Sequence, residues 1–251
     1  AVARVVGGAI LMLIIGVVKG LQIPTSWREW GLYIILGMTG NFVYQVVFNQ
    51  GLLTIPAATS SIIMALTPMT TALMALVVYK DFMRPIGWLF TITAFAGVAI
   101  IILWKGPINV PMGAFWTLFG MILFAIYNIV NRGLSLKGHD SITVATWSMF
   151  TGAIMALPFV SQSVATIAAA SPIAWLAIIY LACFSSALGF VFWSYALEHA
   201  EHVSDVTNFM YLSPLVAAIV AAILIGEIPD LGLYIGAPII LCSLYMFNKC
   251  R

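Results

Sequence analysis

Residues 57–81 read AATSSIIMALTPMTTALMALVVYKD, and residues 203–227 read VSDVTNFMYLSPLVAAIVAAILIGE. An offset of 146 residues brings Pro68 onto Pro214 and aligns four further identical residues. Each copy begins with small and hydroxyl-bearing residues, carries Leu-x-Pro, continues apolar, and ends on an acid thirteen residues after its proline. An internal repeat in an apolar chain predicts two related halves, an arrangement in which many carriers place a substrate site between the repeats.

The composition places the chain in a lipid bilayer. Hydrophobic residues make up 63% of the 251 residues and charged residues only 7%, whereas soluble domains carry about 25% charged residues. The net charge is +2, and no basic run is present that could neutralise a series of phosphates. We therefore expect membrane lipid and a small-molecule substrate as partners, and no nucleic acid.

The sequence indicates no cofactor and no metal site. The three cysteines, Cys183, Cys242 and Cys250, lack CxxC or histidine-partnered spacing. The run Glu198-His199-Ala200-Glu201-His202 has side chains that can bind metal, but it occupies a short connection between apolar segments. We interpret the cysteines as packed small residues and the charged run as a hydrated turn, with a metal or pH-sensing site as the alternative for the run.

Nine apolar segments approach the length of about 20 residues that a membrane-spanning helix needs. Turn and helix-start residues such as Arg84-Pro85 and Ser171-Pro172 separate them. The loops are too short for a second domain, so the function must reside in the helical bundle. The expected segments are 2–19, 30–53, 56–79, 85–104, 111–131, 142–161, 172–197, 204–226 and 231–248.

Basic residues are distributed unevenly over the loops. If the chain starts outside and alternates, eight of the ten Lys and Arg residues lie on the cytoplasmic side, in agreement with the positive-inside rule. We therefore expect a bacterial inner-membrane protein whose C-terminus is cytoplasmic. The expected cytoplasmic residues are Lys19, Arg28, Lys80, Arg84, Arg132, Lys137, Lys249 and Arg251, and the expected external ones are Arg4 and Lys105.

The repeat divides the chain at about residue 105. Residues 106–251 hold five expected helices and residues 1–105 hold four, and the offset places the partner of segment 111–131 upstream of Ala1. We infer that a first helix of the fold is missing from this chain. Because five is odd, the two repeats are expected to have opposite orientations in the membrane. The predicted fold is an all-α integral membrane protein of two inverted five-helix repeats, with nine of the ten helices present.

Two sets of residues resemble the drug/metabolite transporter superfamily, in particular its EamA-type members with ten helices. They are Ala57-Ala58-Thr59-Ser60-Ser61 with Leu66-Thr67-Pro68, and Val206-Thr207 with Leu212-Ser213-Pro214 and Gly226-Glu227. Arg4 fits the arginine that these proteins often place at the start of their second helix. The first copy departs from the family in having Lys80-Asp81 where Gly-Glu is usual, and the family's first helix, which lines the cavity, is absent.

A stripe of amides marks the second segment. Asn41, Gln45 and Asn49 recur at every fourth residue and Tyr44 stands beside them, so they share one face of a helix. Uncharged amides inside a membrane are costly unless they pair or meet water. The stripe therefore faces either neighbouring helices or a substrate cavity.

The Leu-x-Pro helices carry a second group of candidates. A proline in mid-helix frees a backbone carbonyl, which hydroxyl groups or water can satisfy. Ser60 and Thr67 fall on one face of the first copy and serve either close helix packing or substrate binding. Asn208 and Tyr211 of the second copy are large and polar-tipped, and we assign them to the cavity.

Aromatic and amide residues of the second half form a third group. Tyr127 and Asn128 lie near the cytoplasmic end of their segment, where Asn131-Arg132 has a solvated terminus as its alternative interpretation. Trp193 lies on the segment that corresponds to the amide stripe. These residues are candidate substrate-binding walls, with a core or lipid-facing position as the alternative for Trp193.

The residues favour a transporter over an enzyme. All three histidines fall in loops and no two acids share a helix interior, so neither nucleophilic nor metal-dependent catalysis is indicated. Aromatic walls with amides and hydroxyls suit amino acids and other zwitterionic or weakly charged solutes, exported by alternating access. The missing midplane carboxylate favours facilitated diffusion over proton coupling. The alternatives are a drug or nucleotide-sugar carrier of the same superfamily, an intramembrane enzyme or a channel, in a monomer or a homodimer.

Overall fold

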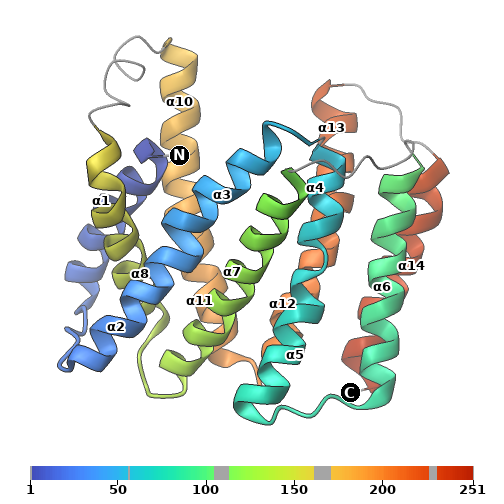
Figure 1. The fold of residues 1–251 in the computed structure, drawn as a ribbon, viewed down its shortest axis with the longest axis horizontal. Coiled ribbons are helices and arrows are strands. Elements are labelled where there is room, and N and C mark those ends of the chain that lie inside the picture. The colour runs from blue at the N-terminus through green and yellow to red at the C-terminus, as the bar shows by residue number, and fades with distance from the viewer. Residues whose placement is uncertain (1, 56, 105–112, 161–170, 226–230, 251) are drawn as a thin grey trace. The chain divides into compact units, whose positions relative to one another are not determined.

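The part of the chain that the computed structural model describes is built from helices alone (Figure 1). It covers residues 2–55, 57–104, 113–160, 171–225 and 231–250. The first half contains α1 (Val2–Lys19), α2 (Trp27–Leu36), η1 (Gly37–Phe42), α3 (Val43–Leu52), α4 (Ala57–Met64), α5 (Thr67–Tyr79) and α6 (Pro85–Leu103). The second contains α7 (Gly113–Ser135), α8 (Ser141–Ala156), η2 (Leu157–Phe159), α10 (Pro172–Tyr180), η3 (Leu181–Leu188), α11 (Gly189–His199), α12 (Val203–Thr207), η4 (Asn208–Leu212), α13 (Ser213–Ile225) and α14 (Leu231–Cys250).

The helices follow the apolar segments, which confirms the expected all-α architecture. Among the described residues, five helical stretches are long and apolar enough to cross a bilayer, and three shorter apolar helices accompany them. The long stretches are Val2–Lys19, Trp27–Leu52, Gly113–Ser135, Ser141–Phe159 and Pro172–His199, and the shorter helices are Thr67–Tyr79, Pro85–Ile101 and Leu231–Phe247.

Both Leu-x-Pro motifs interrupt a helix, which corrects the prediction that the helices continue through them. In the first copy α4 ends at Met64 and α5 begins at Thr67, so that Pro68 lies in the first turn of α5. In the second copy α12 passes into the 3-10 segment η4, and α13 begins at Ser213 with Pro214 in its first turn. The reason is that proline lacks an N–H and its ring clashes with the carbonyl four residues earlier, whereas the first turn of a helix tolerates it.

Each proline leaves one backbone carbonyl without its helical hydrogen-bond donor. In both copies that carbonyl accepts a hydrogen bond from a different donor. In the first copy the hydroxyl of Thr67 donates to the carbonyl of Met64 at 2.6 Å. In the second copy the backbone N–H of Ser213 donates to the carbonyl of Met210. The prediction that a hydroxyl satisfies the freed carbonyl is therefore confirmed for the first copy.

Two π-helical segments, η1 and η3, recur in corresponding places. The offset of 146 that aligns the prolines moves residues 37–42 onto residues 183–188, which lie inside η3. A π-helical turn widens the helix locally and is frequent at functional sites. The recurrence is a structural counterpart of the sequence repeat.

The chain divides into two compact units, and the first consists of Ala1–Val46 and Ile126–Ala200. Its core joins α1 to α8, with Val5, Met12 and Met149 among its buried members. A Cβ added at Gly37 would come within 2.5 Å of the backbone nitrogen of Gly152. These two glycines therefore allow η1 and α8 to approach closely.

The second unit consists of Val47–Ala125 and Glu201–Arg251. Within it α6 and α14 run side by side (Figure 1) and share a buried core that includes Val98 and Ile240. A Cβ added at Gly236 would lie 2.6 Å from the carbonyl oxygen of Gly97, so the two backbones approach closely through glycine. Tyr211 of η4 belongs to the same core.

The two units do not coincide with the two predicted repeats, because each unit takes helices from both halves of the sequence. The repeat boundary expected at residues 105 and 106 lies outside the described residues, as do Gly226-Glu227, Pro229-Asp230 and Arg251.

Candidate functional site

Unit 1 contains a group of mostly buried polar side chains that are joined by hydrogen bonds. The amide nitrogen of Asn131 on α7 donates to the hydroxyl of Tyr127 at 3.0 Å and to that of Ser194 on α11 at 2.9 Å. The indole N–H of Trp193 donates to the Oδ1 atom of Asn128 at 2.8 Å. We call these five residues the unit 1 polar cluster. It fixes α7 to α11 by mutual hydrogen bonds.

The aromatic ring of Tyr127 is packed on two sides. The ring of Phe190 meets it edge-on with centroids 5.5 Å apart, a favourable geometry for aromatic pairs. A Cβ added at Gly40 would lie 2.3 Å from the same ring. The close fit means that Tyr127, which is fully buried, serves as a core residue of unit 1.

The residues of the predicted amide stripe differ in how deeply they are buried. Asn41 and Gln45 are buried, and the amide nitrogen of Asn41 lies 3.4 Å from the hydroxyl of Ser148 on α8. Tyr44 is half-buried, and Asn49 is exposed. Asn41 lies in the π-helical segment η1 and Asn49 in α3, so the regular spacing of an α-helix does not relate the two side chains. The prediction of one continuous face is wrong at Asn49.

Unit 2 contains a different kind of polar face, on the 3-10 segment η4. Asn208 is 2% exposed and Tyr211 is fully buried. Residues three apart eclipse one another in a 3-10 helix, so their side chains share one face, which we call the η4 face. The amide nitrogen of Asn208 lies 3.4 Å from the hydroxyl of Thr91 on α6. Its Oδ1 atom and the hydroxyl of Tyr211 have no hydrogen-bond partner among the described residues.

Two neighbouring elements of unit 2 add hydroxyl groups of the same kind. The hydroxyls of Ser60 on α4 and Thr207 on α12 are also buried and without a partner in the described part of the chain. In unit 1 the comparable atom is Asn131 Oδ1, whose amide nitrogen is bonded twice. Among the described residues, buried polar atoms without partners are therefore concentrated in unit 2.

Thr67 differs from the other candidates in unit 2. Its hydroxyl is bonded to the carbonyl that Pro68 leaves free, and the side chain is fully buried. We assign Thr67 to the helix interruption.

Arg4 and Arg132 contact the interior of unit 1, which we did not predict from the sequence. The Nε atom of Arg4 on α1 donates to the hydroxyl of Ser186 in η3 at 2.8 Å. Arg132 is buried, and its guanidinium donates to the carbonyls of Leu197 and Glu198 at 2.7 and 3.0 Å, at the end of α11. The interpretation of Asn131-Arg132 as a solvated terminus is therefore wrong. Unpaired carbonyls at a helix end attract a cation, but no sequence signal identifies which arginine reaches them.

The charged run 198–202 contributes to helix ends. The backbone N–H of Ser141 donates to Glu198 Oε2 at 3.0 Å, His202 precedes α12 and pairs with Asp81, and the His202 N–H donates to Asp205 at 3.1 Å. Among the described residues, no three His, Cys, Asp or Glu side chains are grouped as a metal site would require.

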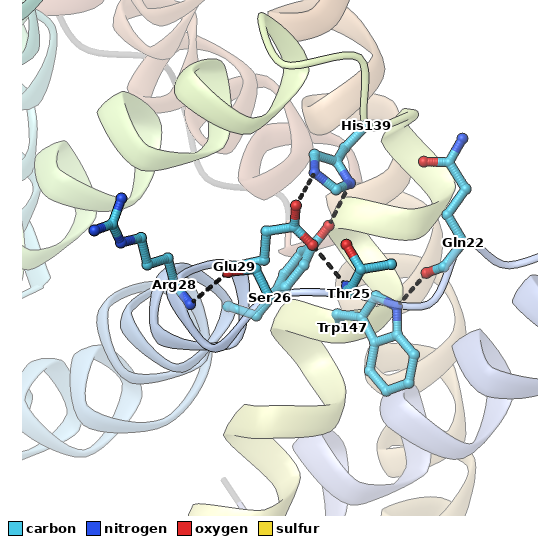
Figure 2. A network of polar contacts seen from close by, with 8 residues as sticks. Gln22, Thr25, Ser26, Arg28, Glu29, His139 and Trp147 are labelled. Atoms are coloured by element: carbon cyan, nitrogen blue, oxygen red, sulfur yellow. Dashed lines mark hydrogen bonds and ion pairs between the residues drawn. The ribbon is translucent and has the colours of Figure 1, made fainter.

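A polar network fastens the loop between α1 and α2 to the start of α8 (Figure 2). The Glu29 carboxylate accepts the Thr25 N–H at 2.8 Å and lies 3.9 Å from His139 Nε2. The hydroxyl of Tyr33 lies 3.2 Å from the other ring nitrogen of His139. The indole of Trp147 donates to the carbonyl of Gln22 at 2.8 Å. All of these contacts lie within unit 1.

The fold and the enclosed polar faces define an integral membrane protein that keeps polar groups inside an apolar helical bundle. The chain belongs to the EamA-like transporter family, whose model matches residues 1–103 and 111–249. The predicted resemblance to drug/metabolite transporters of the EamA type is thereby confirmed, and the protein is a membrane transporter.

Two relatives and one solved structure are similar to the chain. It is 28% identical, over 92% of its length and 76% of the relative's, to a protein of Streptantibioticus cattleyicolor described as a probable terminal-alkyne amino-acid exporter. It is 27% identical to the uncharacterized transporter YyaM of Bacillus subtilis, over 85% of the chain and 72% of the relative. A solved crystal structure matches the whole chain and 88% of its own with a TM-score of 0.81 at 17% identity, which supports the fold.

Proposed function

We propose that the protein exports amino acids, or closely related zwitterionic metabolites, across a bacterial inner membrane, with its C-terminus in the cytoplasm. We further propose that the substrate contacts the η4 face together with Ser60 and Thr207. The observation that carries this proposal is the set of buried oxygen atoms in unit 2 that lack a partner among the described residues.

The energetic argument concerns the cost of these atoms. A buried polar group without a hydrogen bond costs about 1–3 kcal/mol, so a chain that retains several of them is expected to satisfy them in another state. The Asn208 Oδ1 atom can only accept a hydrogen bond, whereas the hydroxyls of Tyr211, Thr207 and Ser60 can donate or accept. An ammonium group supplies three donors and a carboxylate supplies acceptors. A zwitterion therefore complements this set, and the uncharged lining favours a solute of low net charge.

The acids beside this region are engaged at helix ends. Asp81, which follows α5, pairs with His202, and Asp205 accepts the His202 N–H as part of the cap of α12. A proton-coupled carrier usually needs a carboxylate at the transport site. This arrangement supports facilitated diffusion, and the two related halves support alternating access.

The name of one relative supports the substrate class. The similar protein of Streptantibioticus cattleyicolor is described as a probable amino-acid exporter. Because fold alone does not set substrate, the proposal for this chain depends on the η4 face.

The test is solute flux in proteoliposomes that contain the purified chain. We expect saturable counterflow of at least one radiolabelled neutral amino acid, and no accumulation when a pH gradient is imposed alone. Empty liposomes and a panel of nucleotide sugars are the controls. Counterflow of nucleotide sugars without that of amino acids would contradict the proposed substrate class, and accumulation driven by the pH gradient alone would contradict facilitated diffusion.

A further inference from the structure

Unit 1 contains a cavity that none of the contacts described so far fills. Its volume is about 360 Å³, at the lower end of the range of about 300–1,000 Å³ for small-molecule sites. It lies where α1 ends, α8 begins and α11 ends. The lining residues are Lys19, Gly20, Leu21, Asp140, Ser141, Ile142, Thr143, Tyr195, Glu198 and His199.

The cavity presents charged groups of both signs. Lys19 is exposed and forms no ion pair or hydrogen bond with any described residue. Glu198 uses its Oε2 atom to accept the Ser141 N–H at 3.0 Å, and its Oε1 atom has no partner in the described part of the chain. Asp140 uses both oxygens to bond Thr143, at 2.8 and 2.7 Å. One cation and one carboxylate oxygen are therefore available to a ligand.

The walls that carry these charges are held in place. The backbone N–H of Gln22 lies 3.3 Å from the hydroxyl of Thr143, and Trp147 holds the Gln22 carbonyl, so the segment after Lys19 is fastened to α8. Figure 2 shows the adjoining network, in which Glu29 lies against His139 directly before Asp140. A site whose walls are fixed in advance loses less free energy on binding.

The third wall is aromatic. The rings of Tyr195 and His199 on α11 lie 4.0 Å apart at 31°, and His199 Nδ1 lies 3.0 Å from the Tyr195 carbonyl. This pair offers an apolar face beside the charged groups.

We propose that this cavity binds a small α-amino acid as a zwitterion and serves as a loading site for transport. The ligand carboxylate meets Lys19, its ammonium meets Glu198, and its side chain lies against Tyr195. A plain amine is repelled by Lys19 and a plain carboxylate by the two acids, so the zwitterion is selected. The inference rests on the proposed function for the substrate class, but it concerns a site separate from the η4 face.

The experiment is photo-crosslinking of the full chain in lipid nanodiscs with a leucine analogue that carries a diazirine in its side chain. We expect labelling of peptides that cover residues 16–22 and 195–199. L-leucine should compete with the labelling, whereas its decarboxylated amine and its deaminated acid should each compete about tenfold less well, as expected for the loss of one charge-assisted contact. Labelling that misses these peptides, or equal competition by the amine, would overturn the proposal.

Two variants sharpen the test, each with a matched control. Lys19→Met should reduce cavity labelling about tenfold and abolish the preference for leucine over the amine, whereas Lys137→Met, at an exposed lysine outside the cavity, should change neither. Glu198→Gln should also reduce labelling, whereas Glu201→Gln should not.

Because Lys19 is exposed, its replacement is not expected to disturb folding, and unchanged labelling in Lys19→Met would contradict the assignment. Cavity labelling without flux in liposomes would support binding of the zwitterion in this cavity, but it would contradict both its role as a loading site and the proposed transport.

Discussion

The unit 1 polar cluster and the η4 face contain the same kinds of side chain, but they differ in whether those side chains have hydrogen-bond partners. In the cluster, the Asn128 amide oxygen holds the indole of Trp193 at 2.8 Å, and Tyr127 accepts from Asn131. On the η4 face, the amide oxygen of Asn208 and the hydroxyl of Tyr211 are buried without a described partner. Asparagine and tyrosine thus bond helices to one another in unit 1, whereas in unit 2 the corresponding atoms lack a partner among the described residues. Residue type alone does not separate these uses.

Asn208→Leu should have the largest effect, and it should be on transport. The change removes the amide that we assign to the substrate, so the rate at limiting substrate should fall roughly 10- to 100-fold. Stability should change little, because the loss of the 3.4 Å contact to the Thr91 hydroxyl is offset by the removal of a buried polar oxygen without a described partner. Counterflow in proteoliposomes and thermal unfolding measure the two effects. A less stable protein with normal flux would place Asn208 among the packing residues.

Asn128→Leu is the matched change in unit 1, and its effect should be on stability. It deprives the Trp193 indole of its acceptor, at an expected cost of about 1–3 kcal/mol. Flux per folded molecule should stay near that of the unchanged protein. Denaturant unfolding in detergent gives the stability, and counterflow normalised to folded protein gives the activity. Loss of flux without loss of stability would move Asn128 from the cluster to the substrate site.

Tyr211→Phe removes a single hydroxyl from the η4 face. We expect flux to fall about five- to tenfold, as for the loss of one hydrogen bond to a ligand, with little change in stability. Tyr127→Phe is the control, because it removes a hydroxyl that accepts from Asn131 and should therefore lower stability more than flux. Equal changes in flux and in stability in the two variants would contradict the assigned difference between the η4 face and the unit 1 polar cluster.

Thr67→Val should have the smallest effect. It removes the hydroxyl that satisfies the Met64 carbonyl, and we expect a loss of about 0.5–1.5 kcal/mol in the free energy of unfolding. Thr70→Val, one turn further along α5, where the side chain is half-buried, is the control. An equal response of Thr67 and Thr70 would show that the bond to Met64 contributes little.

The fold was largely predictable because membrane-spanning helices depend on length and polarity, which are local properties of sequence. Segment 2–19 matches α1 in full, and segment 85–104 differs from α6 by one residue. The helix interruptions were mispredicted, although the positions of Pro68 and Pro214 contain the information, since a proline is tolerated in a first turn and not in mid-helix.

The sequence could not predict which candidate site residues are hydrogen-bonded within the protein, because their partners are distant in sequence. Trp193 and Asn128 lie 65 residues apart and Asn208 and Thr91 lie 117 apart, and no local pattern specifies such pairs. The exposure of Asn49 was not predictable either, because the π-helical segment η1 interrupts the regular helical spacing between Asn41 and Asn49. Nor was the burial of Arg132 against the end of α11, because it requires knowing which two helices are neighbours.

The central claim is that the buried polar atoms of the η4 face bind the substrate, and its most direct test is ligand-dependent thermal stability. The unchanged protein should melt at a higher temperature when a transported amino acid is present at saturation. Asn208→Leu should melt at nearly the same temperature as the unchanged protein without ligand and gain nothing from the ligand, whereas Asn128→Leu should melt at a lower temperature and still gain. A ligand-induced increase in Asn208→Leu equal to that of the unchanged protein would contradict the claim.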